Sequence, residues 1–176
     1  LAGYEEVKPM VFCGIFPVAS EDYEELKEAL EKLALNDSSF TFDPESSGAL
    51  GLGFRCGFLG LLHMSIIQER LEREFDLDLI STAPSVSYQV RTKAGDEMMV
   101  DNPSELPDIG EIESIAEPMV EISIHVPNEY VGQIITLCEK RRGIQQDIKY
   151  ITAERVQVIY YLPLSEMVFD FYDQLK

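Results

Sequence analysis

The chain has 176 residues, of which 45% are hydrophobic and 26% are charged, and its 32 acidic against 14 basic residues give a formal net charge of −18. This is the composition of a folded globular protein with room for one ordinary domain or two small ones, and it excludes a disordered or collagen-like chain. The negative charge disfavours unaided binding of nucleic acid, and no run of about 20 apolar residues is present to span a membrane.

The first half of the chain predicts a split βαβ, or ferredoxin-like, unit. Residues 10–18, 40–42, 50–58 and 77–82 have the short apolar runs of strands, and residues 21–36 and 60–75 have apolar positions at helical spacing. Ser20 is expected to cap the first helix, and residues 44–48 are expected to form a turn-rich connection. Both faces of the first strand are apolar, so we expect another domain or a partner to cover the face that the helices leave open.

The middle of the chain predicts a hairpin followed by a linker. Residues 87–100 have the pattern of a hairpin that turns at Ala94 and Gly95. Residues 101–118 are rich in proline and acidic residues, contain no lysine or arginine, and predict a linker held down by its scattered apolar side chains.

The second half repeats the first pattern. Residues 120–126 alternate as a strand, residues 128–142 as a helix with Gly143 expected at C′, and residues 145–151 and 155–162 as a strand pair. Ser165 is expected to cap a last helix with four inward positions, Val168, Phe171, Tyr172 and Leu175. The fold class is therefore α+β, with two ferredoxin-like sandwiches of antiparallel strands, the second lacking its last strand. We expect a first domain over residues 1–86, a hairpin and linker over 87–118, a truncated second domain over 119–176, and a natural polypeptide that continues past Lys176.

The glycine-rich run from Gly51 to Gly57 is the most suggestive local motif. Its third glycine falls one position late for a dinucleotide fingerprint, and no Walker lysine follows, so nucleotide binding is disfavoured. One alternative is an RNA-recognition sheet that presents Phe54 and Phe58 to bases, and another is that the glycines let the strand pack closely against the following helix.

Catalytic and metal-binding constellations are not apparent in the sequence. His63 and His125 have no further ligands at suitable spacing and are expected to be structural. The three cysteines form no C-x-x-C pair, so they predict buried thiols of a cytoplasmic protein. We therefore predict no enzyme activity, no metal and no cofactor for this chain, although a ligand-sensing ferredoxin-like module stays open as an alternative.

Four basic residues stand out in the acidic second half. Lys140, Arg141, Arg142 and Lys149 gather positive charge around one predicted helix end. They serve either as partners of the helix dipole or as contacts to RNA phosphates.

Long stretches of the chain resemble a known family. Residues 51–64, 67–75 and 82–84 resemble the third domain of the LepA, or elongation factor 4, family of translational GTPases. Residues 117–143, 160–166 and 170–173 resemble the next domain of that family, which is similar to the C-terminal domain of elongation factor G.

The resemblance implies a ribosome-binding part of a factor that uses GTP and Mg²⁺ and moves tRNAs one codon backward. It implies docking on rRNA and ribosomal proteins of both subunits, contact with the factor's GTPase domain, a monomer, no DNA partner, and a cytoplasmic location that allows peripheral association with the membrane. By this resemblance Lys140, Arg141, Arg142 and Lys149 are expected to contact rRNA or the ribosome, and Arg55 is expected to make an interdomain or ribosomal contact.

Overall fold

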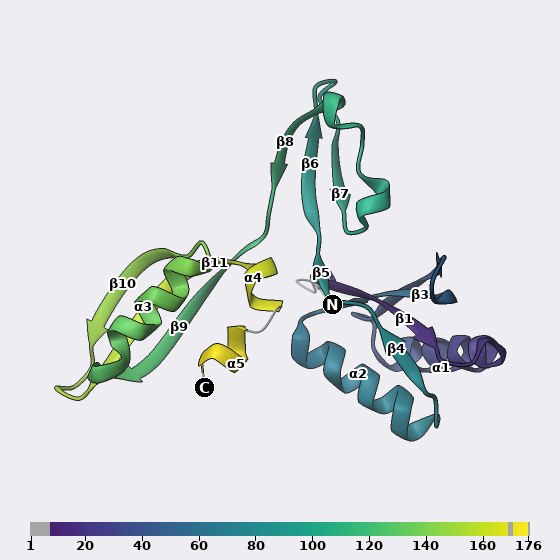
Figure 1. Cartoon of the computed structure of the whole chain (residues 1–176), viewed down its shortest axis with the longest axis horizontal. Helices are drawn as coiled ribbons and strands as arrows, with labels where there is room; N and C mark the ends of the chain where they lie inside the picture. The colour runs from purple at the N-terminus through teal and green to yellow at the C-terminus, as the bar shows by residue number, and fades with distance from the viewer. Residues whose placement is uncertain (1–7, 169–170, 176) are drawn as a thin grey trace, which may run out of the picture. The chain divides into compact units, whose positions relative to one another are not determined.

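The computed structural model describes residues 8–168 and 171–175, except the side chains of 172 and 173, so the inward position predicted for Tyr172 lies outside the described residues. It divides into two units, residues 1–87 and 88–176, coloured from purple to teal and from teal to yellow in Figure 1. Each unit is described by itself. None of the helices in the described ranges is both long and apolar enough to cross a membrane.

The first unit is a split βαβ sandwich, as predicted. Its elements are β1 (Val11–Pro17), α1 (Tyr23–Asn36), β2 (Thr41–Ser47), β3 (Gly51–Phe58), α2 (Leu61–Glu74), β4 (Leu79–Ser81) and the short β5 (Ser85–Val86). The sheet is antiparallel with strand order β2-β3-β1-β4, and β5 pairs with β1. Because the strands alternate their side chains between two faces, every second residue of β1 and β3 points to the same side.

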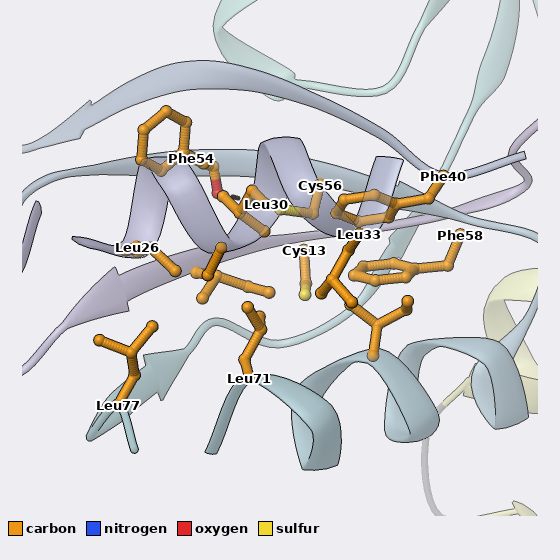
Figure 2. Packing of buried hydrophobic residues seen from close by; sticks show 13 residues of the cluster. Cys13, Leu26, Leu30, Leu33, Phe40, Phe54, Cys56, Phe58, Leu71 and Leu77 are labelled. Carbon is orange, nitrogen blue, oxygen red and sulfur yellow. Dashed lines mark hydrogen bonds between the residues drawn. The ribbon is translucent and has the colours of Figure 1, made fainter. Parts of the chain in front are cut away.

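The core of this unit lies between the sheet and the two helices, as Figure 2 shows. Strands β1 and β3 contribute Cys13, Ile15, Phe54, Cys56 and Phe58, and none of these is more than 1% exposed. Helix α1 contributes Leu26, Ala29, Leu30 and Leu33, and α2 contributes Ile67 and Leu71. The apolar residues at three- and four-residue spacing on the helices therefore pack against those at two-residue spacing on the strands, and together they form one apolar layer.

Two local expectations in this unit were wrong. Ser20 does not cap α1: it begins a 3₁₀ turn, η1 (Ser20–Asp22), in which the Asp22 amide donates to the Ala19 carbonyl at 3.0 Å, so the serine lies inside the first turn. Residues 44–47 are not a turn but continue β2, with Pro44 opposite Phe54. Proline fits there because β2 is at the edge of the sheet, where a missing N–H breaks no ladder.

The segment that begins the second unit forms a three-stranded antiparallel sheet. The expected hairpin is present as β6 (Tyr88–Thr92) and β7 (Glu97–Val100), with Gly95 at a positive φ of 94° in the turn. Two 3₁₀ turns, η2 (Pro103–Glu105) and η3 (Ile109–Glu111), lead to β8 (Ile112–Ala116), which pairs with β6. The segment predicted as a linker thus includes a strand, in which Ile115 lies opposite Val90 and Ile112 opposite Thr92, with a register irregularity between the two pairs.

The remainder of the second unit follows the second split βαβ pattern. Its elements are β9 (Met119–Pro127), η4 (Asn128–Tyr130), α3 (Val131–Lys140), β10 (Ile144–Tyr150), β11 (Arg155–Pro163), α4 (Leu164–Val168) and α5 (Phe171–Leu175). The described strands form an antiparallel sheet in the order β10-β11-β9. Its core joins alternate residues of β9 and β11 to Ile134 and Cys138 of α3 and to Met167 and Phe171 of the last helices.

The helix expected from Ser165 onward is described in two stretches, α4 and α5, and the first of them begins at Leu164. Ser165 is the second residue of α4 rather than its cap, and the Leu164 amide donates to the Pro118 carbonyl at 2.8 Å. The Ser165 hydroxyl faces the side chains of Glu117 and Arg142. The Ser165 hydroxyl therefore makes contacts with residues distant in the sequence, whereas local spacing predicted that it would cap the helix.

Candidate functional site

The basic cluster lies where α3 ends, and its backbone there forms a Schellman motif. The Arg142 amide donates to the Glu139 carbonyl at 3.2 Å, and the Gly143 amide donates to the Cys138 carbonyl at 2.8 Å. Arg142, with φ of 58°, occupies the left-handed C′ position that the sequence assigned to Gly143. Gly143 is C″, where a Cβ would stand 2.6 Å from the Cys138 carbonyl oxygen, so glycine is required for close approach rather than for positive φ.

The two arginines of this cluster are paired within their own unit. Arg142 Nε lies 3.0 Å from Glu166, and its two terminal nitrogens donate to the carboxylate of Glu117. Arg141 Nη1 lies 3.5 Å from Glu166. Hydrogen bonds to Glu117 and Glu166 raise the pKa of Arg142 above its usual range. The arginines thus tie the end of α3 to the chain before β9 and to α4, and their charge is balanced by the two carboxylates.

Lys140 differs from its neighbours. Its side chain is exposed, and within the described ranges no carboxylate pairs with it. It lines an open groove of about 500 Å³ beside α3 and α5, together with Glu129, Gly132, Gln133, Thr136, Leu137 and Gln174. Lys140 is therefore the member of the cluster whose charge is available to a partner.

Lys149 lies apart from the other three cations. Ile144, at the start of β10, comes four residues after Lys140, the last residue of α3, whereas Lys149 is five residues further along the strand, or roughly 17 Å at about 3.4 Å per residue. Its Nζ is 3.4 Å from Asp147, and it forms a row across the sheet with Gln157 and His125. The four predicted contact residues thus belong to two separate surfaces.

Arg55 lies on the sheet face of the first unit that the helices leave open. Its guanidinium donates to the Ser85 hydroxyl at 2.7 Å and lies 4.0 Å from Glu45, and its side chain is only 16% exposed. Arg55 therefore joins β2, β3 and β5. Its expected contact with another domain or with the ribosome stays a prediction.

Two glycines of β3, Gly53 and Gly57, lie on this same open face of the sheet. Gly53 lies under the ring of Phe16, and Gly57 lies under Phe12 and Thr41, so a side chain at either position would overlap them. The expectation that the glycines allow packing against the following helix was wrong, because they alternate with the core residues and point away from α2. Phe16 is 1% exposed, so the glycines already bury this ring, and a partner for the rest of the face stays a prediction.

The RNA-recognition alternative is wrong for the residues that suggested it. Phe54 is 1% exposed and Phe58 is fully buried, and their rings pack against Tyr23, Phe42 and Phe40 in the core. Buried rings cannot stack on bases.

The remaining candidate groups are the two histidines and the three cysteines, and of these His125 is exposed on β9, where its expected structural role stays a prediction. His63 accepts a hydrogen bond from the Leu59 amide at Nδ1, so Nε2 carries the proton that it donates to Asp37 at 2.8 Å, as expected for a structural histidine. All three cysteines are buried and free, and burial raises the pKa of Cys13 and Cys138 to about 11. Within the described ranges, no group of three or more His, Cys, Asp or Glu side chains is placed to hold a metal ion.

Comparisons with known proteins match both halves of the chain to the same kind of factor. Residues 7–83 match the family "Elongation Factor G, domain III", and residues 114–176 match "Elongation factor G C-terminus". The chain is 60% identical over 174 residues to elongation factor 4 of Maridesulfovibrio salexigens and 58% identical over 176 residues to that of Oleidesulfovibrio alaskensis. These alignments cover 99% and 100% of this chain but 29% of each relative, so the chain spans under a third of their length.

Proposed function

Because the chain belongs to the elongation factor 4 family, we propose that it is a non-catalytic, ribosome-binding part of a GTP-dependent translation elongation factor. The observation that carries this proposal is the whole-chain similarity to elongation factor 4, combined with two α+β units in which Arg55, His63 and Arg142 pair with residues of their own unit. In the full-length factor, the chain would dock on the cytoplasmic ribosome and relay contacts to the GTPase domain while tRNAs move back by one codon.

The chain's own residues do not fit GTP or Mg²⁺. The sequence contains no lysine after a glycine, as the phosphate-binding G-x-x-x-x-G-K-[ST] motif requires. We therefore assign GTP and Mg²⁺ to other parts of the full-length factor and derive no catalytic step here.

We propose Lys140 as the principal rRNA contact of the second unit. It is exposed and has no carboxylate partner within the described ranges, so it can neutralise a phosphate without breaking an internal pair. Arg141 and Arg142 would join it only by exchanging Glu166 and Glu117 for phosphates. Lys149 would make a separate contact from the far end of β10.

Co-sedimentation of the 176-residue chain with purified ribosomes tests this proposal. We expect the unsubstituted chain to sediment with ribosomes, and we expect Lys140→Glu to weaken binding several-fold and to reduce its salt dependence by about one phosphate contact. Lys27→Glu is the matched control, since Lys27 is an exposed lysine on α1 outside the cluster. Failure of the unsubstituted chain to sediment would refute the proposal, and equal effects of the two substitutions would remove Lys140 from it.

A further inference from the structure

Two of the three cysteines of the chain lie directly opposite each other on neighbouring strands. Cys13 of β1 is the register partner of Cys56 of β3, and the two strands are antiparallel. Both side chains belong to the apolar layer between the sheet and the helices, where both thiols are free and fully buried (Figure 2). The third cysteine, Cys138, belongs to the core of the second unit. The first unit therefore contains a cross-strand pair of thiols on one face of its sheet.

The register of this pair suits a disulfide. Directly opposed residues of antiparallel strands have Cα atoms about 4.5–5.5 Å apart, and disulfides join Cα atoms about 4.4–6.8 Å apart. Each sulfur has a separate weak contact: the Gln68 amide lies 4.0 Å from Cys13 Sγ, and the Cys56 thiol faces the Phe54 carbonyl at 3.8 Å. Formation of an S–S bond would replace these contacts without any change of strand register.

The closed unit protects both thiols from oxidants. The thiolate is the reactive form of cysteine, and burial raises the pKa of Cys13 to about 11 and the pKa of Cys56 well above its ordinary value. Beside the Cys13 thiol, the half-buried Gln68 of α2 also donates to the Ser81 hydroxyl of β4 at 2.7 Å, so it links the helix to the sheet. Movement of α2 away from the sheet breaks this link, admits water and oxidant, and returns the thiols to their ordinary reactivity.

We propose that Cys13 and Cys56 are a redox-responsive pair, which hydrogen peroxide oxidises to a disulfide when α2 opens, and that this disulfide then holds β1 to β3. The proposal does not depend on the proposed function. Because the disulfide joins strands that are separated in sequence by α1 and β2, it closes a long loop and stabilises the folded unit against unfolding.

The reaction has two steps that each release one water. The Cys13 sulfur attacks one oxygen of hydrogen peroxide, the O–O bond breaks, and the other oxygen leaves as water with the thiol proton, which gives a sulfenic acid. The Cys56 sulfur then attacks the sulfenic sulfur, the S–S bond forms, and the S–O bond breaks to release the second water with the Cys56 proton. The two sulfurs together lose two electrons, and the peroxide gains them. A dithiol reductant reverses the change by thiol–disulfide exchange.

Peptide mapping of the peroxide-treated 176-residue chain tests the proposal. Free thiols are alkylated, and a non-reducing tryptic digest separates the cysteines because Lys27 and Arg55 lie between Cys13 and Cys56. We expect one intramolecular disulfide, between Cys13 and Cys56, with Cys138 unpaired. We expect urea below the unfolding transition to raise its rate of formation at least several-fold, because opening becomes more frequent.

The stability of the oxidised chain gives a second measurement. Hydrogen–deuterium exchange of residues 8–87 follows the urea midpoint of the first unit. We expect oxidation to raise this midpoint by about 1 M or more and dithiothreitol to reverse the rise.

Cys138→Ala is the matched control for Cys56→Ala, since each removes one buried thiol, from different cores. We expect the control to keep both the disulfide and the rise in the urea midpoint, and Cys56→Ala to lose both. Should Cys56→Ala fail to fold, the peptide map of the unsubstituted chain decides alone. No disulfide, a disulfide to Cys138 or between chains, a rate that urea does not change, or a midpoint that oxidation does not raise would each overturn the proposal.

Discussion

At the scale of single residues, glycine has different uses in the two units. Gly53 and Gly57 make room for phenyl rings on a sheet face, whereas Gly143 lets the chain after α3 pass the Cys138 carbonyl and the side chains of Tyr160 and Leu162. The residue with the positive φ is Arg142, which precedes Gly143. The same residue forms ion pairs with Glu117 and Glu166, so a strained backbone position and two ion pairs coincide there.

Replacing Gly143 by alanine tests this interpretation. The added Cβ would stand 2.6 Å from a backbone oxygen, so we expect Gly143→Ala to lower the free energy of unfolding by about 1–3 kcal/mol in urea titrations. Gly132→Ala in α3 is the control, since its Cβ would meet nothing within 4 Å and alanine favours helix, so the free energy of unfolding should stay equal or rise. Equal losses in both variants would contradict the close-approach argument.

At the scale of elements, the end of α1 is joined to the start of α2 through Asp37. Its carboxylate accepts from the Ser39 hydroxyl at 2.5 Å, from the Ser39 amide and from His63. The Ser39 hydroxyl is the main cause of a lowered Asp37 pKa, and His63 adds to it.

The pH dependence of unfolding should report this link. Because the folded pKa of Asp37 is lower than the unfolded value, its stabilising contribution is complete above about pH 4 and is lost as the pH falls through the folded pKa. We expect urea titrations between pH 7 and pH 2 to show this acid loss, and Asp37→Asn to reduce it. An unchanged acid limb in the variant would contradict the assignment.

Periodicity predicted most of these elements, but not the contacts that end them. The steps of two and of three or four residues located both split βαβ patterns, because burial of one face requires them. Ser20 and Ser165 were assigned as caps, and Pro44 as a turn, because local spacing carries no information on neighbouring strands. The candidate site shows the same limit: the cluster of Lys140, Arg141 and Arg142 is visible in the sequence, whereas its carboxylates are 24 and 25 positions away.

At the scale of the whole molecule, the two units have separate cores. The first is built on β1, β3, α1 and α2, and the second on β9, β11, α3 and the last two helices. Each core therefore contains the apolar contacts that stabilise its own unit.

A pair of matched leucine substitutions tests the independence of these cores. Leu30 and Leu162 are both fully buried, one in each core, and Leu→Ala costs about 2–5 kcal/mol at such sites. We expect hydrogen–deuterium exchange to lose protection in residues 8–87 for Leu30→Ala and in residues 119–168 for Leu162→Ala. Loss spread evenly over both units by either variant would show one cooperative core instead.

The charged side chains of the segment that carries β7 and β8 are all acidic. Between Lys93 and Lys140 lie eleven acidic residues and no lysine or arginine. Trypsin, which cleaves after basic residues, therefore finds no site there even in the unfolded chain. Strands β7, β8 and β9 therefore leave a tryptic digest together with α3 as a single long acidic peptide, whereas β6, which contains Arg91, is cut away from them.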